Sequence, residues 1–280
     1  MTSPTHPTPY PEVNLVLDEL VPSIQSILGD HFLGMYLYGS LATGDFDQDS
    51  DVDYIVVTDD VLPDDLFSAL DAMHERIKYI DSWCATQLEG SYIPQAALRE
   101  YDPVHALGIH IDRGQSERLH RMHLDDPLLS RAWWGGWILL RDILYRKGIT
   151  LAGSAPQTFI DPVSPDEVRQ AASAILHGWT KQILDNPAEI DSRGYQSYTV
   201  LTLCRINYTL QNGMVVSKPV ALRWAQESLD PRWSPLIKRA WLGRQNAGLK
   251  AEAGDVNETL EFIRYTLAIA KPAEGVSPAP

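Results

Sequence analysis

The stretch MYLYGSLATGDFDQDSDVDYIVV, from Met35 to Val57, decides the fold class of this chain. A Gly39-Ser40 turn separates two apolar runs, and Asp51 and Asp53 stand at the head of the second run. In a strand, residues two apart share one face, so both carboxylates point the same way while Val52 points into the core. An unpaired buried charge is costly, and two like charges this close repel each other. The pair therefore predicts a cation between the two carboxylates.

The surrounding residues indicate which cation and which ligand. Oxygen ligands with no nearby His or Cys favour Mg²⁺, which commonly binds one or two carboxylates together with substrate phosphates. Gly39 and Ser40 lie at the end of the preceding strand, where a tight turn presents backbone N–H groups and a hydroxyl to phosphate oxygens. Glu89 lies in a third strand-like segment, and an adjacent strand would bring it to the aspartates as a metal ligand or as a base.

Helix and strand patterns alternate around this stretch, as in a mixed α/β domain. Helical spacing is expected over 13–28, where Pro22 marks a kink or a restart, and over 65–80. Strands are expected over 32–38, 53–57 and 83–93. Residues 94–114 are expected to be irregular, 133–147 helical with three tryptophans, and the GITLAGSAP segment a loop.

The second half of the chain is predicted to be helical. The SPDE sequence at 164–167 is a strong helix start, with Ser as N-cap, Pro at the first helical position and Glu completing a capping box. Further helices are expected over 195–211, 219–228, 235–247 and 256–270, joined by short turns that are typical of a bundle. We therefore expect an α/β domain over 1–157 and an all-α domain over 158–280.

Composition excludes some classes of function. The formal charge of −14 argues against a nonspecific nucleic-acid binder and suits a cationic ligand, although solubility alone would also explain it. Cys84 and Cys204 lie in apolar segments, as expected of free thiols in a reducing compartment. There is no secretory pattern at the N-terminus and no apolar run of the ~20 residues that a membrane span needs. We expect a cytoplasmic monomer that binds neither membranes nor nucleic acids.

The spacing of these residues resembles the signature of the nucleotidyltransferase superfamily. Gly39-Ser40 is followed by Gly44 and then by Ser50-Asp51-Val52-Asp53. The resemblance implies that the Gly-Ser turn and Ser50 hold a triphosphate and that Asp51 and Asp53 bind magnesium. It also implies that a third acidic residue on a neighbouring strand completes the site, and Glu89 then matches the family's catalytic base.

A second resemblance lies downstream. SYTVLTLCRINYTLQNGMVVSKPVALRWAQESL, from Ser197 to Leu229, is similar to the helical C-terminal domain of the streptomycin/spectinomycin adenylyltransferases. The resemblance implies that Arg205 and Lys218 reach the nucleotide phosphates and that this domain closes over the cleft. Cations are also needed to neutralise a triphosphate, and Arg offers a bidentate fork. Arg205 would otherwise be a helix-surface residue, but Thr202 and Ile206 share its face and favour a semi-buried position.

Taken together, the two resemblances imply a magnesium- and ATP-dependent adenylyltransferase. The acceptor would be the hydroxyl of a small polycationic molecule such as an aminoglycoside, with pyrophosphate as the second product. One alternative keeps the chemistry and changes the acceptor to a protein, a tRNA end or another metabolite. Another alternative is a nucleotide-binding regulator without catalysis, which the complete set of acidic and cationic candidates disfavours.

Three further segments have more than one interpretation. The acidic residues of the 183–197 segment would receive ammonium groups or simply form an exposed loop: Asp185, Glu189 and Asp191. The histidines of the 105–123 segment suggest zinc, but their spacing fits no strong template, so ordinary surface or supporting histidines are favoured: His105, His110, His120 and His123. The tryptophans of the 133–147 segment would stack on a sugar or base, or pack in the core, which helical spacing favours: Trp133, Trp134 and Trp137.

Overall fold

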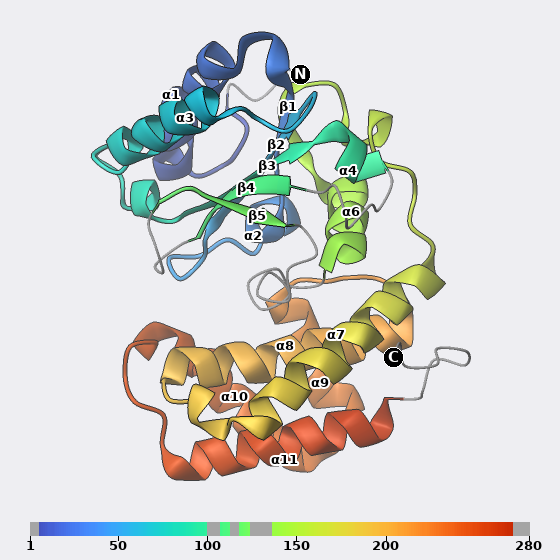
Figure 1. Ribbon diagram of the computed structural model, residues 1–280. Coiled ribbons are helices and arrows are strands. Elements are labelled where there is room, and N and C mark those ends of the chain that lie inside the picture. Colours follow the sequence, from blue (N-terminus) through green and yellow to red (C-terminus); the bar gives the residue numbers. More distant parts are fainter. Residues whose placement is uncertain (1–5, 100–106, 113–117, 124–135, 271–280) are drawn as a thin grey trace. The chain divides into compact units, whose positions relative to one another are not determined.

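The computed structural model describes residues 6–99, 107–112, 118–123 and 136–270 (Figure 1). The chain divides into two compact units, Met1–Ala132 with Ile143–Pro162 and Trp133–Asp142 with Val163–Pro280. The change between units falls inside helix α6 (Gly136–Lys147), between Asp142 and Ile143, and again after Pro162. Each unit is therefore assembled from two separate pieces of chain.

The first unit is built on a six-stranded mixed sheet with the order β5-β4-β3-β2-β1-β6. Strands β2 and β3 run parallel, and every other neighbouring pair is antiparallel. The strands are β1 (Phe32–Leu37), β2 (Val52–Thr58), β3 (Leu88–Pro94), β4 (Leu107–Ile111), β5 (His120–His123) and β6 (Ile149–Gly153). The parallel pair lies in the middle of the sheet, and it is the pair that carries the carboxylates.

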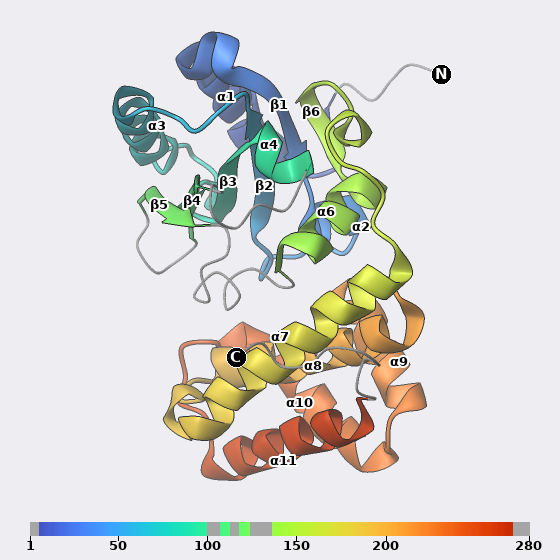
Figure 2. The same ribbon diagram turned by 45° about the vertical axis from the view of Figure 1, so that its right-hand side comes forward.

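Helices α1 (Pro11–Leu28) and α3 (Asp64–Ile77) contact each other and cover one face of the sheet (Figures 1 and 2). Alternate strand residues such as Val52, Tyr54 and Tyr92 are buried in the core that these helices complete. Because side chains alternate along a strand, Asp53 and Glu89 point to the opposite face. The apolar core thus fixes the direction of both carboxylates.

Several predicted elements of this unit are confirmed. The strands expected over 32–38 and 53–57 are present, and so is the helix expected over 13–28. This helix, α1, continues through Pro22, so the restart expected there does not occur. Of the strand expected over 83–93, only the second half is a strand, because Trp83–Thr86 forms a 3₁₀ turn that Ser82 caps. Further short elements are α2 (Gly39–Thr43), α4 (Gln95–Arg99) and the 3₁₀ turns Gly29–His31 and Pro156–Thr158.

Two predictions are wrong. Residues 94–114 are not irregular throughout, since they contain α4 and β4. The GITLAGSAP segment is not only a loop, since Ile149–Gly153 forms β6 and pairs with β1. In both cases the strand is stabilised by hydrogen bonds to residues far away in the sequence. Trp133 and Trp134 lie outside the described residues, whereas Trp137 is buried.

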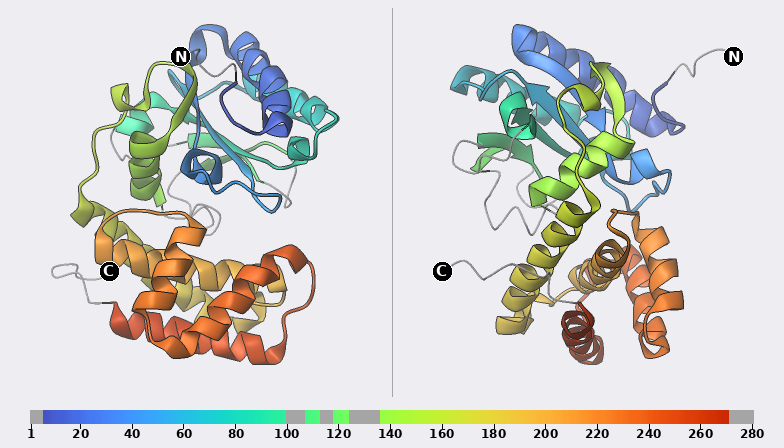
Figure 3. Two further views of the ribbon diagram at one scale, coloured as in Figure 1. Left: turned by 180° about the vertical axis from the view of Figure 1, so that it is seen from behind. Right: turned by 90° about the vertical axis from the view of Figure 1, so that its right-hand side faces the viewer.

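The second unit is helical, as predicted. Helix α8 (Arg193–Asn212) contacts α7 (Pro165–Asp185), α9 (Lys218–Ser228), α10 (Ser234–Gly243) and α11 (Ala253–Ile269) (Figures 1 and 3). The predicted capping box of α7 is present, with Glu167 N donating to Ser164 Oγ and Ser164 N donating to the Glu167 carboxylate. Gly213 ends α8 with a left-handed conformation at φ 66°. Short 3₁₀ turns complete the unit at Pro187–Glu189, Pro231–Trp233 and Arg244–Asn246.

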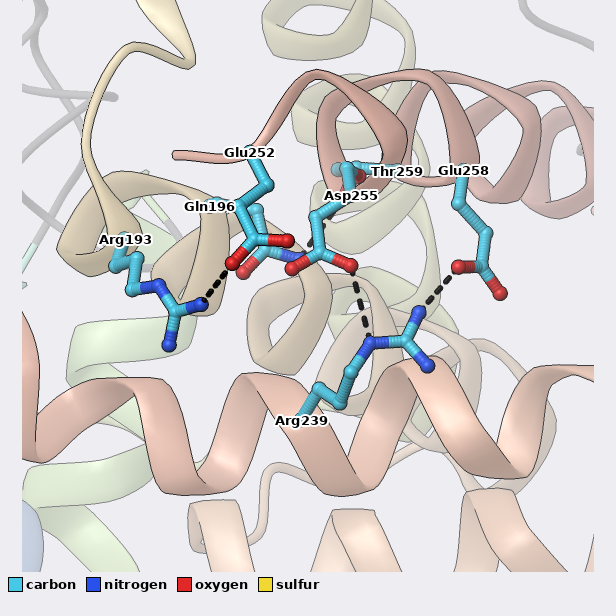
Figure 4. Close-up of polar contacts among 7 residues, drawn as sticks. All are labelled: Arg193, Gln196, Arg239, Glu252, Asp255, Glu258 and Thr259. Atoms are coloured by element: carbon cyan, nitrogen blue, oxygen red, sulfur yellow. Dashed lines mark hydrogen bonds and ion pairs between the residues drawn. The ribbon is translucent and has the colours of Figure 1, made fainter. Parts of the chain in front are cut away.

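Ion pairs connect α8 and α10 to the start of α11 (Figure 4). Arg193 donates to Glu252 at 2.8 Å, and Arg239 bonds both Asp255, at 3.0 Å, and Glu258. Beneath them Gln196 donates to Thr259 at 3.1 Å. Of these acidic residues, Asp255 lies in the first turn of α11, where the helix dipole stabilises a negative charge. Among the described residues, no helix combines the length and the apolar character needed to cross a membrane.

Candidate active site

Two of the predicted carboxylates are direct neighbours across the parallel strands. Asp53 of β2 pairs in register with Glu89 of β3, and Val52 pairs with Leu88. Neighbouring strands lie about 4.8 Å apart, so the two carboxylates start from adjacent positions on one face. Asp51 lies directly before β2, two residues from Asp53, and its charge acts on Tyr38 together with those of Asp53 and Glu89. The sheet thus brings together the three acidic residues that the sequence predicts at one site.

The glycine turn lies directly against one of these carboxylates. Gly39 has φ +60°, and a Cβ atom built on it would come within 1.9 Å of Asp53 Oδ2. The backbone is tied to the same residue, because Tyr38 N donates to Asp53 O at 3.1 Å. Only glycine combines this conformation with this proximity at no steric cost. Gly39 therefore allows the backbone of the turn to approach the acidic residues.

The two predicted phosphate-binding serines are placed differently. Ser40 Oγ is buried and has no hydrogen-bond partner among the described atoms. An unsatisfied buried hydroxyl is costly, so this one is suited to a ligand oxygen. Ser50 Oγ donates to Asp47 Oδ1 at 2.8 Å and accepts from Asp47 N at 3.0 Å. In this position Ser50 stabilises the loop before Asp51. To bind a phosphate, its hydroxyl would have to donate to a phosphate oxygen in place of Asp47.

Tyr38 is a site residue that the sequence pattern does not single out. Burial raises its pKa well above the usual value, and the negative charges of Asp53, Glu89 and Asp51 raise it further. The tyrosine therefore stays neutral and lies within the electrostatic reach of all three carboxylates. The available signal was its position directly before Gly39, where a strand ends at the functional turn.

The acidic residues suit magnesium but do not form a closed ligand set. Within the described ranges, no group of three or more His, Cys, Asp or Glu side chains is arranged to hold a metal ion. Asp53 and Glu89 are neighbours in the sheet and Asp51 lies directly before β2, and like charges this close repel each other. Mg²⁺ needs only one or two carboxylates when phosphates and water complete its octahedron. Two aspartates beside a turn that the sequence predicts to bind phosphate fit that requirement, whereas a preformed three-carboxylate set is absent from the described residues.

The predicted cationic residues belong to the second unit. Arg205 is half-buried on α8 between buried Thr202 and Ile206, as its spacing predicts, and its Nε donates to Val216 O at 3.0 Å. Lys218 is half-buried and begins α9. The bond from Arg205 fixes the segment that leads into Lys218. Both cations are therefore held near one turn of this unit.

The acidic 183–197 segment and the histidines of the 105–123 segment form ion pairs within the protein where they are described. In the 183–197 segment Asp185 is exposed and pairs with Lys181 at 3.0 Å. His110 and His120 lie on β4 and β5 and face Asp112, at 2.9 Å and 3.8 Å. His105 lies outside the described residues, and so does the side chain of His123.

Two family models and several known proteins resemble parts of this chain or most of it. Residues 18–105 match the family model of the nucleotidyltransferase domain, and residues 158–268 match that of the aminoglycoside adenylyltransferase C-terminal domain. An aminoglycoside (3'') (9) adenylyltransferase of Rhizobium radiobacter is 30% identical over 119 residues, which cover 41% of this chain and 42% of the relative. A spectinomycin 9-adenylyltransferase of Campylobacter jejuni is 25% identical over 89% of this chain and 93% of its own.

A solved structure shares the fold over most of the chain. Spectinomycin adenyltransferase AAD(9) from Enterococcus faecialis, determined with ATP and spectinomycin, matches with a TM-score of 0.64 and 18% identity. The match covers 90% of this chain and 98% of that one. The two family models cover the segments that hold the carboxylates and the two cations, respectively. The chain therefore joins a nucleotidyltransferase domain to a C-terminal domain of the aminoglycoside adenylyltransferase family.

Proposed function

We propose that this protein transfers AMP from ATP to a hydroxyl group of a small polycationic antibiotic of the aminoglycoside class and releases pyrophosphate. The observation that carries the proposal is the register of Asp53 with Glu89, directly beside the Gly39 turn. The named activities of the relatives and the formal charge of −14 support the choice of nucleotide and acceptor. An acidic protein attracts a cationic acceptor over long range.

In the proposed reaction, each of the site residues has a separate role. The acceptor oxygen forms a bond to the α-phosphorus, the bond from that phosphorus to the bridging oxygen breaks, and pyrophosphate leaves. Glu89 accepts the proton of the acceptor hydroxyl, which is general base catalysis. The Gly39 turn and Ser40 donate hydrogen bonds to phosphate oxygens, and Ser50 joins them when it releases Asp47. Mg²⁺ held by Asp51 and Asp53 would supply charge neutralisation for the triphosphate.

We also assign Arg205 and Lys218 to the phosphates of ATP, on the basis of charge and the resemblance of their segment to the family. Arg205 presents a planar fork that suits phosphate oxygens, and Lys218 adds a point charge. Replacing Arg205 by Gln is expected to weaken ATP binding, which isothermal titration measures directly. Unchanged ATP affinity in this variant would contradict the assignment.

The proposal is tested with the purified full chain, ATP, Mg²⁺ and a panel of aminoglycosides that includes spectinomycin. The expected product is an adenylylated antibiotic seen by mass spectrometry, with an equal amount of pyrophosphate. Substituting GTP, CTP and UTP for ATP defines the nucleotide. A protein or tRNA that acquires AMP while no antibiotic does would contradict the acceptor and leave the transfer chemistry intact. A protein that binds ATP and releases no pyrophosphate with any acceptor would be a regulator.

The role of Glu89 has its own test. Glu89→Gln keeps the size of the side chain and removes the base, so we expect transfer to fall by about 10²-fold or more while Mg-ATP binding persists. Glu75→Gln is the matched control, because Glu75 lies on α3 and pairs with Lys78 at 2.8 Å. Equal activity in Glu89→Gln and the control would show that Glu89 is not the base.

A further inference from the structure

A hydrogen-bonded chain that the proposed reaction does not use connects β3 to β4. Ser91 Oγ and His110 Nδ1 are 2.6 Å apart, and His110 Nε2 and Asp112 Oδ1 are 2.9 Å apart. Ser91 and His110 are completely buried, whereas the side chain of Asp112 is 24% exposed. This series of hydrogen bonds therefore begins in the core at Ser91 and ends at the Asp112 carboxylate, which reaches solvent.

The same three residue types occur in the catalytic triads of serine hydrolases, but this set cannot work as one. A nucleophilic serine must meet a substrate carbonyl, and Ser91 has no exposed surface. Ser91, at the buried end of the hydrogen-bonded series, is thus fixed and unreactive. Any effect of the series on the site must act through Asp112, at its other end.

The position of Asp112 follows from the register of the strands. Ser91 pairs with His110 and Gly90 with Ile111, and Asp112 directly follows the end of β4, so the register extended by one residue sets Asp112 level with Glu89. Glu89 is in turn paired with Asp53. Asp53 and Glu89 on neighbouring strands, and Asp112 at the end of the next strand, therefore follow one another at the same level of the sheet. Opposed residues have Cβ atoms about 5 Å apart, and like charges in that position destabilise a sheet.

The histidines draw the Asp112 carboxylate away from this row. Oδ1 bonds to His110, and Oδ2 lies 3.8 Å from Nε2 of His120 on β5. The two imidazole rings meet edge to face with centroids 5.7 Å apart. Partial burial alone would raise the pKa of Asp112, but the hydrogen bond from His110 and the two nearby rings hold it below the usual range. Both oxygens of this carboxylate are thus directed toward imidazole nitrogens.

We propose that His110, anchored by Ser91, is a positioning residue that keeps the carboxylate of Asp112 turned toward β5 and out of the acidic set of Asp51, Asp53 and Glu89. This inference rests on the proposed function of that set. A released Asp112 adds a fourth carboxylate, which strengthens the binding of divalent cations and occupies the space that the acceptor hydroxyl needs beside Glu89. The residue acts through Asp112 and does not touch the substrate.

A pair of substitutions separates the two ends of the histidine. In His110→Asn the amide lies near the position of Nδ1, so it faces Ser91 and the donor to Asp112 is lost. In His110→Gln the amide reaches the position of Nε2 and keeps that donor. We expect His110→Asn to lower kcat about tenfold or more, with KM for ATP unchanged, and His110→Gln to stay within about twofold of the wild type.

The double variant that combines His110→Asn with Asp112→Asn is the decisive test. If His110 restrains the charge of Asp112, removing that charge makes the restraint unnecessary, so His110→Asn/Asp112→Asn regains at least about half of the wild-type kcat. A merely structural role of His110 predicts no such rescue. A double variant as slow as His110→Asn overturns the inference, and so does a His110→Asn variant with wild-type kcat.

Mn²⁺ binding provides a readout apart from activity. Isothermal titration with Mn²⁺ is expected to show about tenfold tighter binding in His110→Asn and wild-type affinity in the double variant, because a freed carboxylate is a further oxygen ligand. If the wild type adenylylates no acceptor, the proposed function fails, and this titration still decides the inference. Unchanged Mn²⁺ affinity in His110→Asn overturns it.

If His110→Asn does not fold, as judged by circular dichroism, His120→Asn replaces it. His120 is 39% exposed and contacts the second oxygen of Asp112, so the core stays intact. We expect a smaller loss of kcat and a smaller gain in Mn²⁺ affinity than in His110→Asn. Asp112→Asn should again suppress both changes. A His120→Asn defect that Asp112→Asn leaves unchanged, or no change in either readout, overturns the inference.

Discussion

His74 should cause the folded protein to lose stability as the pH falls from 7 to 5. The residue is buried on α3, and its Nε2 lies 3.1 Å from Tyr54 Oη and 2.8 Å from Tyr92 Oη. Its Nδ1 is buried without a hydrogen-bond partner, so a second proton would have no acceptor. Burial lowers the pKa of His74 from 6.5 to about 3, against a smaller opposing effect of Asp71.

The magnitude follows from the difference in proton binding between the two states. Because the folded-state pKa lies below 6.5, the unfolded chain binds the proton first, and the free energy of unfolding declines below pH 6.5 until the pH approaches about 3. Each pH unit in this interval costs about 1.4 kcal/mol. Between pH 7 and pH 5 about 1.5 units lie below 6.5, so the contribution of His74 is about 2 kcal/mol.

Urea unfolding of the wild type and of His74→Gln at pH 7, 6 and 5 measures this contribution. The variant is less stable at pH 7, but its free energy of unfolding should decline by about 2 kcal/mol less than that of the wild type between pH 7 and 5. His177→Gln, at an exposed histidine of α7, is the matched control for the substitution. Parallel pH profiles of the wild type and His74→Gln would refute the reasoning.

Three further substitutions test single features of the structure. Gly39→Ala places a methyl group against Asp53 at a positive φ, so AMP transfer should be lost, as an activity assay would show; wild-type activity would contradict the packing of the turn. Gly178→Ala, in an exposed position of α7 with nothing within 4 Å, is the matched control for activity and should raise the free energy of unfolding by about 0.5–1 kcal/mol. Ser164→Ala breaks the capping box with Glu167 and should lower that free energy by about 1 kcal/mol, measured by urea titration; no change would indicate that solvent replaces the cap.

The elements that the sequence predicts well are those with local causes. The capping box at Ser164 and the left-handed stop at Gly213 depend on residues within one turn, and both are present. The β4 and β6 strands depend on pairing with distant partners. In LGIHI the alternation is obscured because His110 is buried through its bond to Ser91, which no local pattern reveals.

The same distinction applies to the candidate site. The spacing of Asp51 and Asp53 predicts a common face, since it depends only on the period of a strand. The sequence predicts that Glu89 lies near Asp53 on an adjacent strand. It does not predict that the two residues pair directly, because the packing of the parallel strands sets their register. The position of Tyr38 directly before Gly39 was a signal in the sequence, whereas the Ser91–His110 contact arises from tertiary packing and has none.

The position of β6 determines how the first unit can be isolated. β6 follows α6 in the chain, yet it pairs antiparallel with β1 and completes that side of the sheet. A fragment that ends at residue 132 would lack β6 and leave the backbone hydrogen-bonding groups of β1 open to other chains. Such an open edge invites intermolecular strand pairing and aggregation. A fragment that ends at residue 162 retains β6 and is therefore the better choice for expressing the nucleotidyltransferase unit alone.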